Sequence, residues 1–501
     1  MQKKSVIIIG GGIGGLGLAC MLSKRGYGVT IVEKNESIGG RARLWQKDGF
    51  TFDMGPSWYM MPDVFEDFFN LLGENVHDHL KLKKLSPSYR VMLKSDGLHY
   101  DFFGDIEKNL ETFERIEPGS GKKLIEFLAM TKYQYKIAKQ EFMYKNYDSI
   151  FDFFNKRVMT LGRKLPLFQK QSSIIKKIFH SEILQKVMQY QTVLIGTSPG
   201  NTPGIYSLMN YVDFGLGVWY PDGGIVELPR ALEKIAKKHG TTVLTSSEVE
   251  SIIVEGIEAK GVTLKNGQTL YADIVVSNAD IAHTDQKLLG SHAEKSQSYW
   301  NSRTLAPSAF MLYLGIKGKL LNVQHHNLIF SKNWDENFDQ IFGKNKTWPT
   351  DPSIYVCVPS KTDASVAPEN HENLFVLVPI APGLEYTDAF ISEYRNKVIV
   401  EIAKAFGAPD LESRIVVERS YCVKDFIADY NAFKGTALGL AHTLQQTATF
   451  RPNNVHKKIK NLFYVGAGTN PGIGMPICLI SAELAYKRIE NITDPSPLTS
   501  L

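Results

Sequence analysis

The 501-residue chain is poor in cysteine and has no large excess of positive or negative charge. Its four cysteines, Cys20, Cys357, Cys422 and Cys478, are scattered without CxxC spacing. This predicts neither a disulfide framework nor a metal site, and it is typical of a reducing compartment. The 57 lysines and arginines nearly balance the 52 acidic residues, so the net charge is only +5. Without a nucleic-acid-binding motif, so weak a bias gives no reason to expect a nucleic-acid partner.

Long hydrophobic runs are also missing, with one apparent exception at residues 5–22. Six of these eighteen residues are glycine, and each would destabilise a spanning helix by about 0.8–1 kcal/mol relative to alanine. We therefore expect a strand, a tight turn and a helix start here, and no membrane span. The overall composition, 43% hydrophobic and 22% charged, excludes a disordered chain, and the length suggests two or three folding units.

The first motif is a strand–turn–helix–strand unit. Residues 5–9 predict a buried parallel strand, a glycine-rich turn and a helical pattern follow, and a second strand over 29–33 ends in an acid. In a dinucleotide-binding unit, glycines let backbone amides approach a pyrophosphate, and the acid accepts hydrogen bonds from ribose hydroxyls. A glycine-rich turn with a solvated acid is the alternative. The predicted binding residues are Gly10, Gly12, Gly14, Gly15, Glu33 and Lys34.

Three later segments have a similar character. Residues 39–43 combine two glycines with two arginines, and residues 48–58 predict a strand followed by a stiff turn. Residues 461–476 lead from a strand through a second glycine-rich turn into a helix over 477–489. A helix start offers free amides to an anionic group. The further candidates for cofactor binding are Gly40, Arg41, Arg43, Gly55, Pro56, Ser57, Trp58, Gly466, Gly474 and Met475.

The middle of the chain divides by its periodicity. Residues 105–195 are rich in helical patterns. Strand patterns recur over 242–280 and at 309–314, 354–358 and 374–378, and a helix is predicted over 388–406. Residues 153–181 carry seven basic residues and no acid, interleaved with apolar ones. Such a segment suits an anionic membrane surface, and a solvated pair of basic helices is the other interpretation. Candidates for an apolar tunnel, or for ordinary core packing, are Trp58, Tyr59, Met60, Met61, Trp219 and Tyr220.

Taken together, these motifs resemble bacterial-type carotenoid (phytoene) desaturases, which belong to the amine-oxidase-like flavoprotein superfamily. The resemblance covers nearly the whole chain. One departure is Asn470, which stands where many members carry histidine, so an imidazole role at that position is in doubt. The segments that carry the resemblance are the GxGxxG turn, Glu33, residues 39–43, Phe52–Pro56, Tyr220–Gly224 and residues 466–472.

The resemblance implies FAD as the cofactor and an α/β fold. We expect a Rossmann-like FAD-binding domain assembled from residues 1–75, 225–290 and 441–493. An inserted α+β substrate domain would comprise 76–224 and 291–440, with a membrane-associating helical region near 153–181 and a loose tail over 494–501. Val249 lies where the superfamily contacts the adenine through backbone atoms, so it joins the candidate cofactor residues.

The implied activity is desaturation of a long apolar polyene, of the phytoene type that leads toward lycopene. A hydride would pass to the flavin, and the adjacent carbon would lose a proton. The alternatives are a 3,4-desaturase of hydroxylated carotenoids, a diapophytoene desaturase, and a carotenoid isomerase or retinol-saturase-like flavoenzyme. The expected partners are an apolar carotenoid, a membrane surface on its cytoplasmic side, and quinone or oxygen as electron acceptor. The sequence singles out no catalytic side chain.

Overall fold

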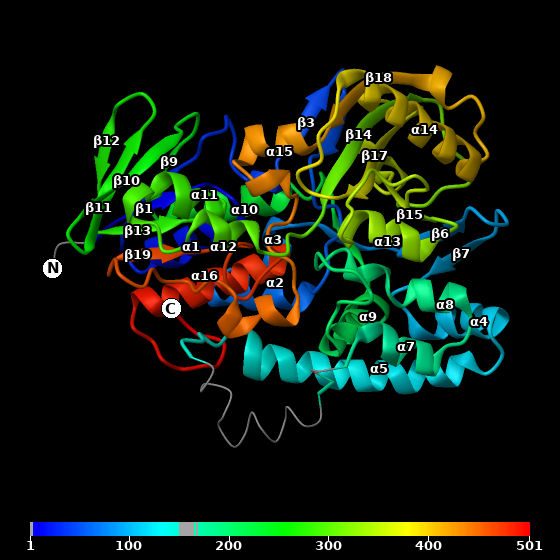
Figure 1. The fold of residues 1–501 in the computed structure, drawn as a ribbon, viewed down its shortest axis with the longest axis horizontal. Coiled ribbons are helices and arrows are strands. Elements are labelled where there is room, and N and C mark those ends of the chain that lie inside the picture. The colour runs from blue at the N-terminus through cyan, green and yellow to red at the C-terminus, as the bar shows by residue number, and fades with distance from the viewer. Residues whose placement is uncertain (1–3, 150–164, 167–168) are drawn as a thin grey trace.

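Two β-sheets, each with its own core, organise the fold (Figure 1). The structure is a computed structural model that describes residues 4–149, 165–166 and 169–501. The first sheet lies at the end of the molecule that carries both chain termini, and the second lies at the opposite end above a layer of helices.

The first sheet is parallel and has the strand order β19-β13-β1-β2-β9. Its central strand is the apolar run at the N-terminus, and the strands at both edges come from much later in the chain. The strands are β1 (Ser5–Ile9), β2 (Gly28–Val32), β9 (Thr242–Leu244), β13 (Ile274–Ser277) and β19 (Leu462–Tyr464).

Both faces of the first sheet are covered, which explains why β1 is apolar at successive positions. Val6 and Ile8 belong to the core shared with helices α1 (Ile13–Lys24), α10 (Glu227–Lys238) and α16 (Met475–Ile489). Ile7 and Ile9 belong to the core on the other face, against an antiparallel sheet. That sheet consists of β10 (Val249–Glu255), β11 (Glu258–Leu264) and β12 (Thr269–Tyr271).

The second sheet has seven strands in the order β18-β14-β17-β16-β15-β6-β7, and β15 and β6 form its one parallel pair among the described residues. Helix α14 (Asp388–Phe406) shares a core with one face, which includes Phe310 and Leu312, whereas Met311 and Tyr313 belong to the core of the other face. The strands are β6 (Tyr89–Leu93), β7 (His99–Phe102), β14 (Ser308–Lys317), β15 (His326–Phe330), β16 (Ile354–Cys357), β17 (His371–Ile380) and β18 (Ile415–Tyr421).

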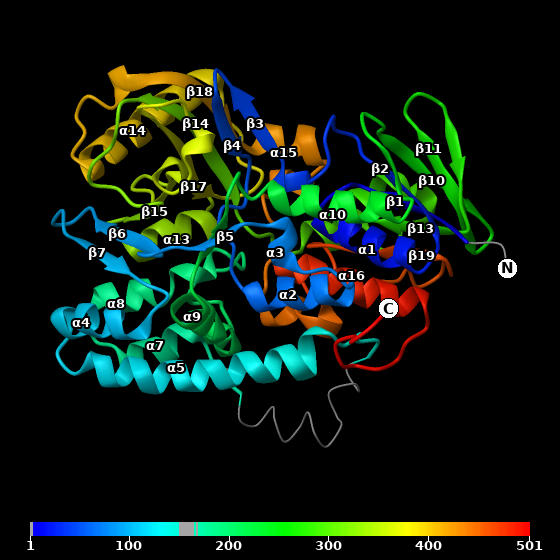
Figure 2. The same cartoon turned by 180° about the vertical axis from the view of Figure 1, so that it is seen from behind.

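A helical layer lies under the second sheet (Figure 2). It contains α4 (Ile106–Ile116), α5 (Ser120–Ile137), α7 (Gln171–Ile178), α8 (Glu182–Val187) and α9 (Leu208–Tyr211). The shorter elements elsewhere include β3 (Leu44–Lys47), β4 (Phe50–Asp53), α2 (Pro62–Leu71), α3 (Val76–His79), β5 (Leu82–Lys84), β8 (Trp219–Pro221), α11 (Ile281–His283), α12 (Gln297–Asn301), α13 (Trp334–Phe342) and α15 (Val423–Tyr430).

The predicted basic segment 153–181 falls mostly outside the described residues, since 153–164 and 167–168 are not among them. Its described part includes α7, on which Lys176 and Lys177 are exposed and Ile175 is buried. No helix in the described ranges combines the length and the apolar character needed to cross a membrane.

The predicted α/β fold with a parallel sheet is confirmed. Strands of the first sheet come from all three segments assigned to the FAD-binding domain, and β6 and β7 join the second sheet from the other predicted domain. The domain boundaries stay a prediction. One segment differs from its assignment, because Phe50 and Phe52 on β4 pack in the core of the second sheet and not the first.

The last eight residues were expected to be a loose tail, and the structure instead holds them against α16. The Leu498 N–H donates to Glu483 Oε1 at 2.8 Å, and Lys487 Nζ donates to the Ser496 carbonyl at 2.5 Å. Leu498 and Leu501 pack on the first core. The polar groups that bind the tail are buried on α16, so the tail's own sequence does not reveal them.

Lys487 and Glu483 form a buried ion pair at 3.1 Å, with side chains 1% and 5% exposed. We predict that Lys487→Met lowers the free energy of unfolding by about 3 kcal/mol, because Glu483 is left buried without its partner. The matched control is Lys122→Met on α5, whose pair with Glu126 is exposed and should contribute at most about 1 kcal/mol. Thermal unfolding of the two variants is the measurement, and equal shifts would contradict the prediction.

Candidate active site

One cavity of about 690 Å³ is lined by residues of both sheets. It extends from the turn after β1 to the strands β15, β16 and β17 of the second sheet. Most of the candidates that the sequence predicts for cofactor binding line this cavity. They are Gly10, Gly12, Gly14, Glu33, Lys34, Gly40, Arg41, Gly55, Pro56, Ser57, Trp58, Val249, Gly474 and Met475.

Three predicted residues, Gly15, Arg43 and Gly466, are not among the lining residues. A Cβ on Gly15 would lie 2.5 Å from the Gly10 carbonyl oxygen, so this glycine permits close packing of the helix on the strand. Arg43 forms an ion pair with Asp429, and its guanidinium lies over the Tyr430 ring. The charge of Arg43 is therefore already balanced by a carboxylate, and a phosphate contact for this residue stays a prediction.

The side chain of Asn278 fills the space between the N-terminal and C-terminal glycine turns. A Cβ on Gly14 would lie 2.9 Å from Asn278 Oδ1 and 2.9 Å from the Gly466 Cα, and a Cβ on Gly466 would lie 2.6 Å from the same oxygen. Asn278 Nδ2 also donates to the Gly10 carbonyl at 3.2 Å. Two turns distant in sequence thus meet around one amide, a role that the sequence analysis missed because Asn278 carries no motif of its own.

Glu33 lies directly after β2 and is 5% exposed. Its Oε2 accepts the Gly11 N–H at 2.8 Å, while Oε1 accepts the Asn35 N–H at 2.8 Å. The carboxylate therefore fixes the first glycine turn as well as lining the cavity. Asn35 Nδ2 also donates to Oε1 at 2.9 Å, so with two acceptor sites on each oxygen it is Oε2 that can still accept a ribose hydroxyl.

Two further motifs, Phe52–Pro56 and Tyr220–Gly224, meet through Asp53. Its carboxylate accepts the N–H groups of Ile225 at 2.8 Å and Val226 at 3.1 Å, at the start of α10. A Cβ on Gly224 would lie 2.9 Å from Asp53 Oδ2. Burial raises the pKa of Asp53 to about 7. This contact fixes the direction in which Gly55 and Pro56 enter the cavity.

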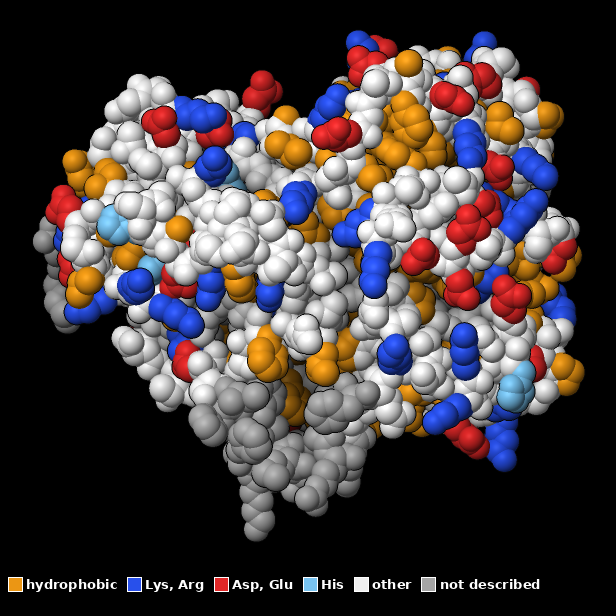
Figure 3. All heavy atoms as spheres, in the orientation of Figure 1, with side chains coloured by type: hydrophobic (Ala, Val, Ile, Leu, Met, Phe, Trp, Pro, Cys, Tyr) orange, Lys and Arg blue, Asp and Glu red, His pale blue; other side chains and the backbone are white. Residues whose placement is uncertain are grey.

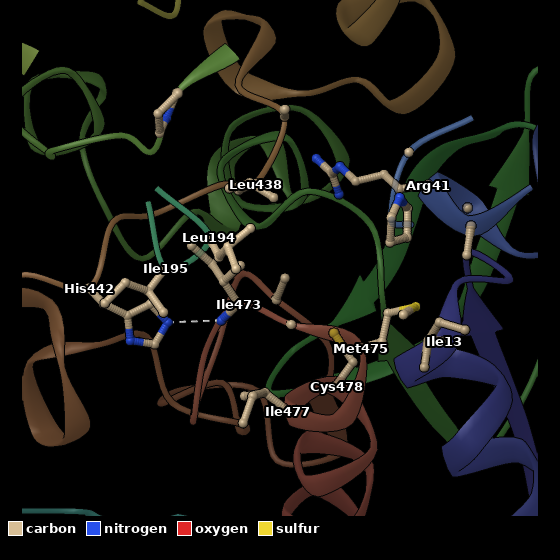
Figure 4. A pocket seen from close by; sticks show the side chains of 18 of the residues that line it. Ile13, Arg41, Leu194, Ile195, Leu438, His442, Ile473, Met475, Ile477 and Cys478 are labelled. Atoms are coloured by element: carbon tan, nitrogen blue, oxygen red, sulfur yellow. Dashed lines mark hydrogen bonds between the residues drawn. The ribbon is translucent and has the colours of Figure 1, made fainter. Parts of the chain in front are cut away.

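The cavity presents donors that the protein leaves without acceptors. Helix α1 begins after Gly12 and α16 begins after Gly474, so two sets of helix-start amides lie at its wall. Arg41 extends into the same space (Figure 4), and its buried Nε has no partner; Asn470 Nδ2 is likewise buried and unpartnered. A dinucleotide with a pyrophosphate and carbonyl-bearing rings supplies acceptors of this kind, so the residues present fit FAD.

His442 binds the turn that contains Asn470, the residue at which the sequence departs from the family pattern. The Ile473 N–H donates to His442 Nε2 at 2.9 Å (Figure 4), so Nδ1 carries the proton and donates to the Tyr206 hydroxyl at 2.7 Å. Burial holds the pKa of His442 well below its usual value. An imidazole therefore supports the turn before α16 from another part of the chain, and both of its nitrogens are used.

Away from the glycine turns the cavity wall is mainly apolar. Among the six tunnel candidates, Trp58, Met60 and Met61 line the cavity, whereas Tyr59, Trp219 and Tyr220 do not. Tyr59 stacks on Phe65 at 4.2 Å between ring centroids, which is core packing. Further apolar lining comes from Met143, Leu194, Ile205, Leu208, Met209, Leu328, Phe330, Trp334, Phe338, Ile341, Phe375 and Leu377.

We predict that Gly14→Ala weakens FAD binding by at least about 10-fold, which corresponds to about 1.4 kcal/mol. The added Cβ would push against backbone at Gly466 as well as against Asn278. Gly200→Ala is the matched control, because a Cβ at Gly200 would meet no atom within 4 Å. Flavin absorbance per polypeptide after purification is the measurement, and full FAD content in Gly14→Ala would contradict the role assigned to this close contact.

Comparison with known sequences gives a consistent result. Residues 13–489 match the family model described as flavin containing amine oxidoreductase. A carotenoid 3,4-desaturase from Haloarcula japonica is 46% identical over 98% of this chain and 99% of its own. A zeta-carotene-forming phytoene desaturase from Myxococcus xanthus is 36% identical over 97% and 94%. A 4,4'-diapophytoene desaturase from Staphylococcus aureus is 33% identical over 96% and 97%.

Solved structures share the fold at much lower identity. Cyclohexylamine oxidase from Brevibacterium oxydans has a TM-score of 0.62 at 14% identity, covering 98% of this chain and all of its own. An oxidoreductase from Methanosarcina mazei has the same TM-score at 17% identity, covering 95% and 98%. The chain therefore belongs to the flavin-containing amine oxidoreductase family and, within it, to the FAD-dependent carotenoid desaturases.

Proposed function

We propose that this chain introduces a double bond at the 3,4 position of a linear carotenoid. The observation that supports this proposal most directly is a cavity in which helix-start amides and unpartnered donors adjoin an apolar wall. A dinucleotide needs the amides and the other donors, and a polyene needs the apolar wall. One space that offers both can hold the two reactants in contact.

The protein's own contribution is orientation and exclusion of water. When bound, FAD supplies an acceptor for a hydride from the carotenoid. The wall built by Met60, Met61, Leu208 and Met209 offers no strong hydrogen-bonding group, so a polyene can slide until the reacting carbons lie at the flavin end. Removing water from this space keeps a cationic intermediate of the substrate from reacting with it.

The position of desaturation is inferred from the relatives. The 46% identity to a 3,4-desaturase exceeds the 36% identity to a phytoene desaturase over nearly the same length, and this favours the 3,4 position. Desaturation of phytoene, which the sequence motifs alone favour, is the second candidate, and the Myxococcus relative supports it.

We further propose that the chain works as a peripheral protein on the cytoplasmic side of a membrane, where its substrate dissolves. The cavity reaches Met143, Tyr147 and Leu165, which flank residues 150–164, and apolar side chains come to the surface along the lower edge in Figure 3. The nearby helix α7 carries the exposed Lys176 and Lys177, which suit anionic head groups. Quinone in the same membrane, or oxygen, would reoxidise the flavin.

The proposed substrate can be tested directly. Purified holoenzyme mixed anaerobically with lycopene in liposomes should lose its oxidised-flavin absorbance, and the product should lack two hydrogen atoms and absorb at longer wavelength. Phytoene is the comparison, and we expect it to react at least about 10-fold more slowly, a difference of about 1.4 kcal/mol in activation free energy. Faster reduction by phytoene would select the second candidate, and no reduction by either would contradict desaturation.

The proposed membrane contact of α7 predicts a loss of binding when its lysines are replaced. Replacing Lys176 and Lys177 together by glutamate should weaken binding to anionic liposomes, measured by sedimentation, by at least about 30-fold, since each lysine near such a surface contributes about 1 kcal/mol. The control replaces Lys397 and Lys404, two exposed lysines on α14, by glutamate. This helix lies on the opposite side of the molecule from α7 (Figure 1). Equal sedimentation of the two variants would show that α7 is not the docking element.

A further inference from the structure

A chain of buried polar groups leads from the cavity wall into the second sheet. The Ser57 hydroxyl lies 2.6 Å from the Tyr355 hydroxyl, which lies 2.8 Å from His326 Nδ1. Ser57 and Tyr355 line the cavity, whereas His326 is wholly buried behind them. We call these three residues the Ser57–Tyr355–His326 chain.

The fold holds the Ser57–Tyr355–His326 chain rigidly. His326 begins β15 and Tyr355 lies on the paired strand β16, so backbone hydrogen bonds fix both residues. The indole of Trp58 stacks on the His326 ring, with 4.2 Å between centroids and 10° between planes. Ser57 and Trp58 belong to the same stiff segment that Asp53 orients. The three hydroxyl and imidazole groups therefore keep their spacing without help from a ligand.

The Ser57–Tyr355–His326 chain can move a proton from the cavity side toward His326. When Ser57 donates to the Tyr355 oxygen and Tyr355 donates to His326 Nδ1, the Ser57 oxygen keeps lone pairs free on the cavity side. The His326 imidazole can receive that proton only when Nδ1 is unprotonated. Burial, together with the neighbouring His325, holds the pKa of His326 well below its usual value and so keeps the ring neutral.

One contact of His326 favours a transient charge on the ring, although burial and His325 oppose that charge. The face of Trp58 can stabilise an imidazolium by a cation–π interaction. His326 Nε2 and His325 Nε2 are buried without partners, and with Cys357 Sγ the donor atoms of these residues lie within 4.8 Å of one another. The groups that face this cluster are Asp363, which is near His325, and Asp53, which is near Cys357.

Desaturation requires a proton acceptor, and this inference rests on the proposed function. One carbon would lose a hydride with its electron pair, for which bound FAD would supply the acceptor. The adjacent carbon then loses a proton, and the electrons of that C–H bond become the new π bond. A carbon next to a cationic centre is a strong acid, so a weakly basic group is sufficient as long as it is neutral and within reach.

We propose that the Ser57–Tyr355–His326 chain receives this proton. Ser57 takes it from carbon and passes its own proton to Tyr355, which passes its proton to His326 Nδ1. Both hydroxyls are regenerated, and one imidazolium remains. Ser57 and Tyr355 are the catalytic residues in this step, while His326 acts through Tyr355 as a positioning residue that stores the charge. His442 is a weaker candidate, because both of its nitrogens are already bonded.

The test begins with Tyr355→Phe, which removes one oxygen and keeps the ring. In anaerobic single turnovers with liposomal carotenoid, we expect the limiting rate of product formation to fall about 100-fold, a typical contribution of positioned acid–base groups. The carotenoid concentration at half-saturation should not change. The control is Tyr394→Phe, because Tyr394 is buried behind the same sheet and bonds only a carbonyl, that of Pro349. A wild-type limiting rate in Tyr355→Phe would overturn the proposal.

A second readout does not depend on turnover. In protein labelled with ¹⁵N-histidine, the His326 resonances are identified by their loss in His326→Gln. Tyr355→Phe should shift the His326 Nδ1 resonance because its donor is removed, whereas Tyr394→Phe should leave it in place. An unshifted resonance would show that the link is absent and overturn the proposal, whatever the enzyme does with carotenoids.

Ser57→Ala keeps the experiment decisive if Tyr355→Phe loses FAD or unfolds, and it should lower the same limiting rate when that rate is expressed per bound FAD. An unchanged rate in Ser57→Ala would also overturn the proposal. Failure of the wild-type protein to convert any carotenoid would instead reject the proposed function, and that result is distinguishable because the nitrogen resonance would still report the hydrogen bond.

Discussion

The close approach of two glycine turns around the side chain of Asn278 is the constraint on which the remaining structure depends. Gly12, Gly14 and Gly466 each leave space that a Cβ would fill, and Asn278 occupies it. Because β13 carries Asn278 to the edge of the sheet between β1 and β19, this contact joins the first and last strands of the chain. The starts of α1 and α16 are consequently directed at the same cavity.

The second sheet contributes buried polar side chains that stay uncharged. Its cavity-facing strands carry a few polar side chains in an apolar wall, and burial keeps their histidines neutral. The pKa of His325 falls to about 3, and that of His326 is also well below the usual range. Neutral imidazoles can accept protons and do not repel a cationic intermediate of the substrate. The first sheet thus supplies fixed donors for an anionic cofactor, while the second supplies uncharged acceptors near the apolar reactant.

Much of the first sheet could be predicted from the sequence because its signals are local. The glycines after β1 and the acid after β2 lie within one βαβ unit, and helix α14 has the predicted bounds because Thr387 caps its start and left-handed Gly407 ends it. Strands β6 and β15 were not predicted, since the parallel pairing between them joins segments far apart in the sequence, although β6 also forms a hairpin with β7. The same reason hid Asn278, His442 and Tyr355, whose roles arise only from contacts across the fold. Gly15 and Gly466 were predicted to bind the cofactor; a Cβ at either would meet closely packed atoms and neither lines the cavity, so a direct cofactor contact for them stays a prediction.

The order of the strands has a consequence for how the protein is made. β19 and α16 complete the nucleotide end of the cavity, and they lie within the last forty residues of 501. A chain emerging from the ribosome therefore carries an unpaired edge at β13 and an unfinished pocket until β19 and α16 have been made. The cavity can therefore surround its cofactor only after α16, whose start lies at the cavity wall, has been made.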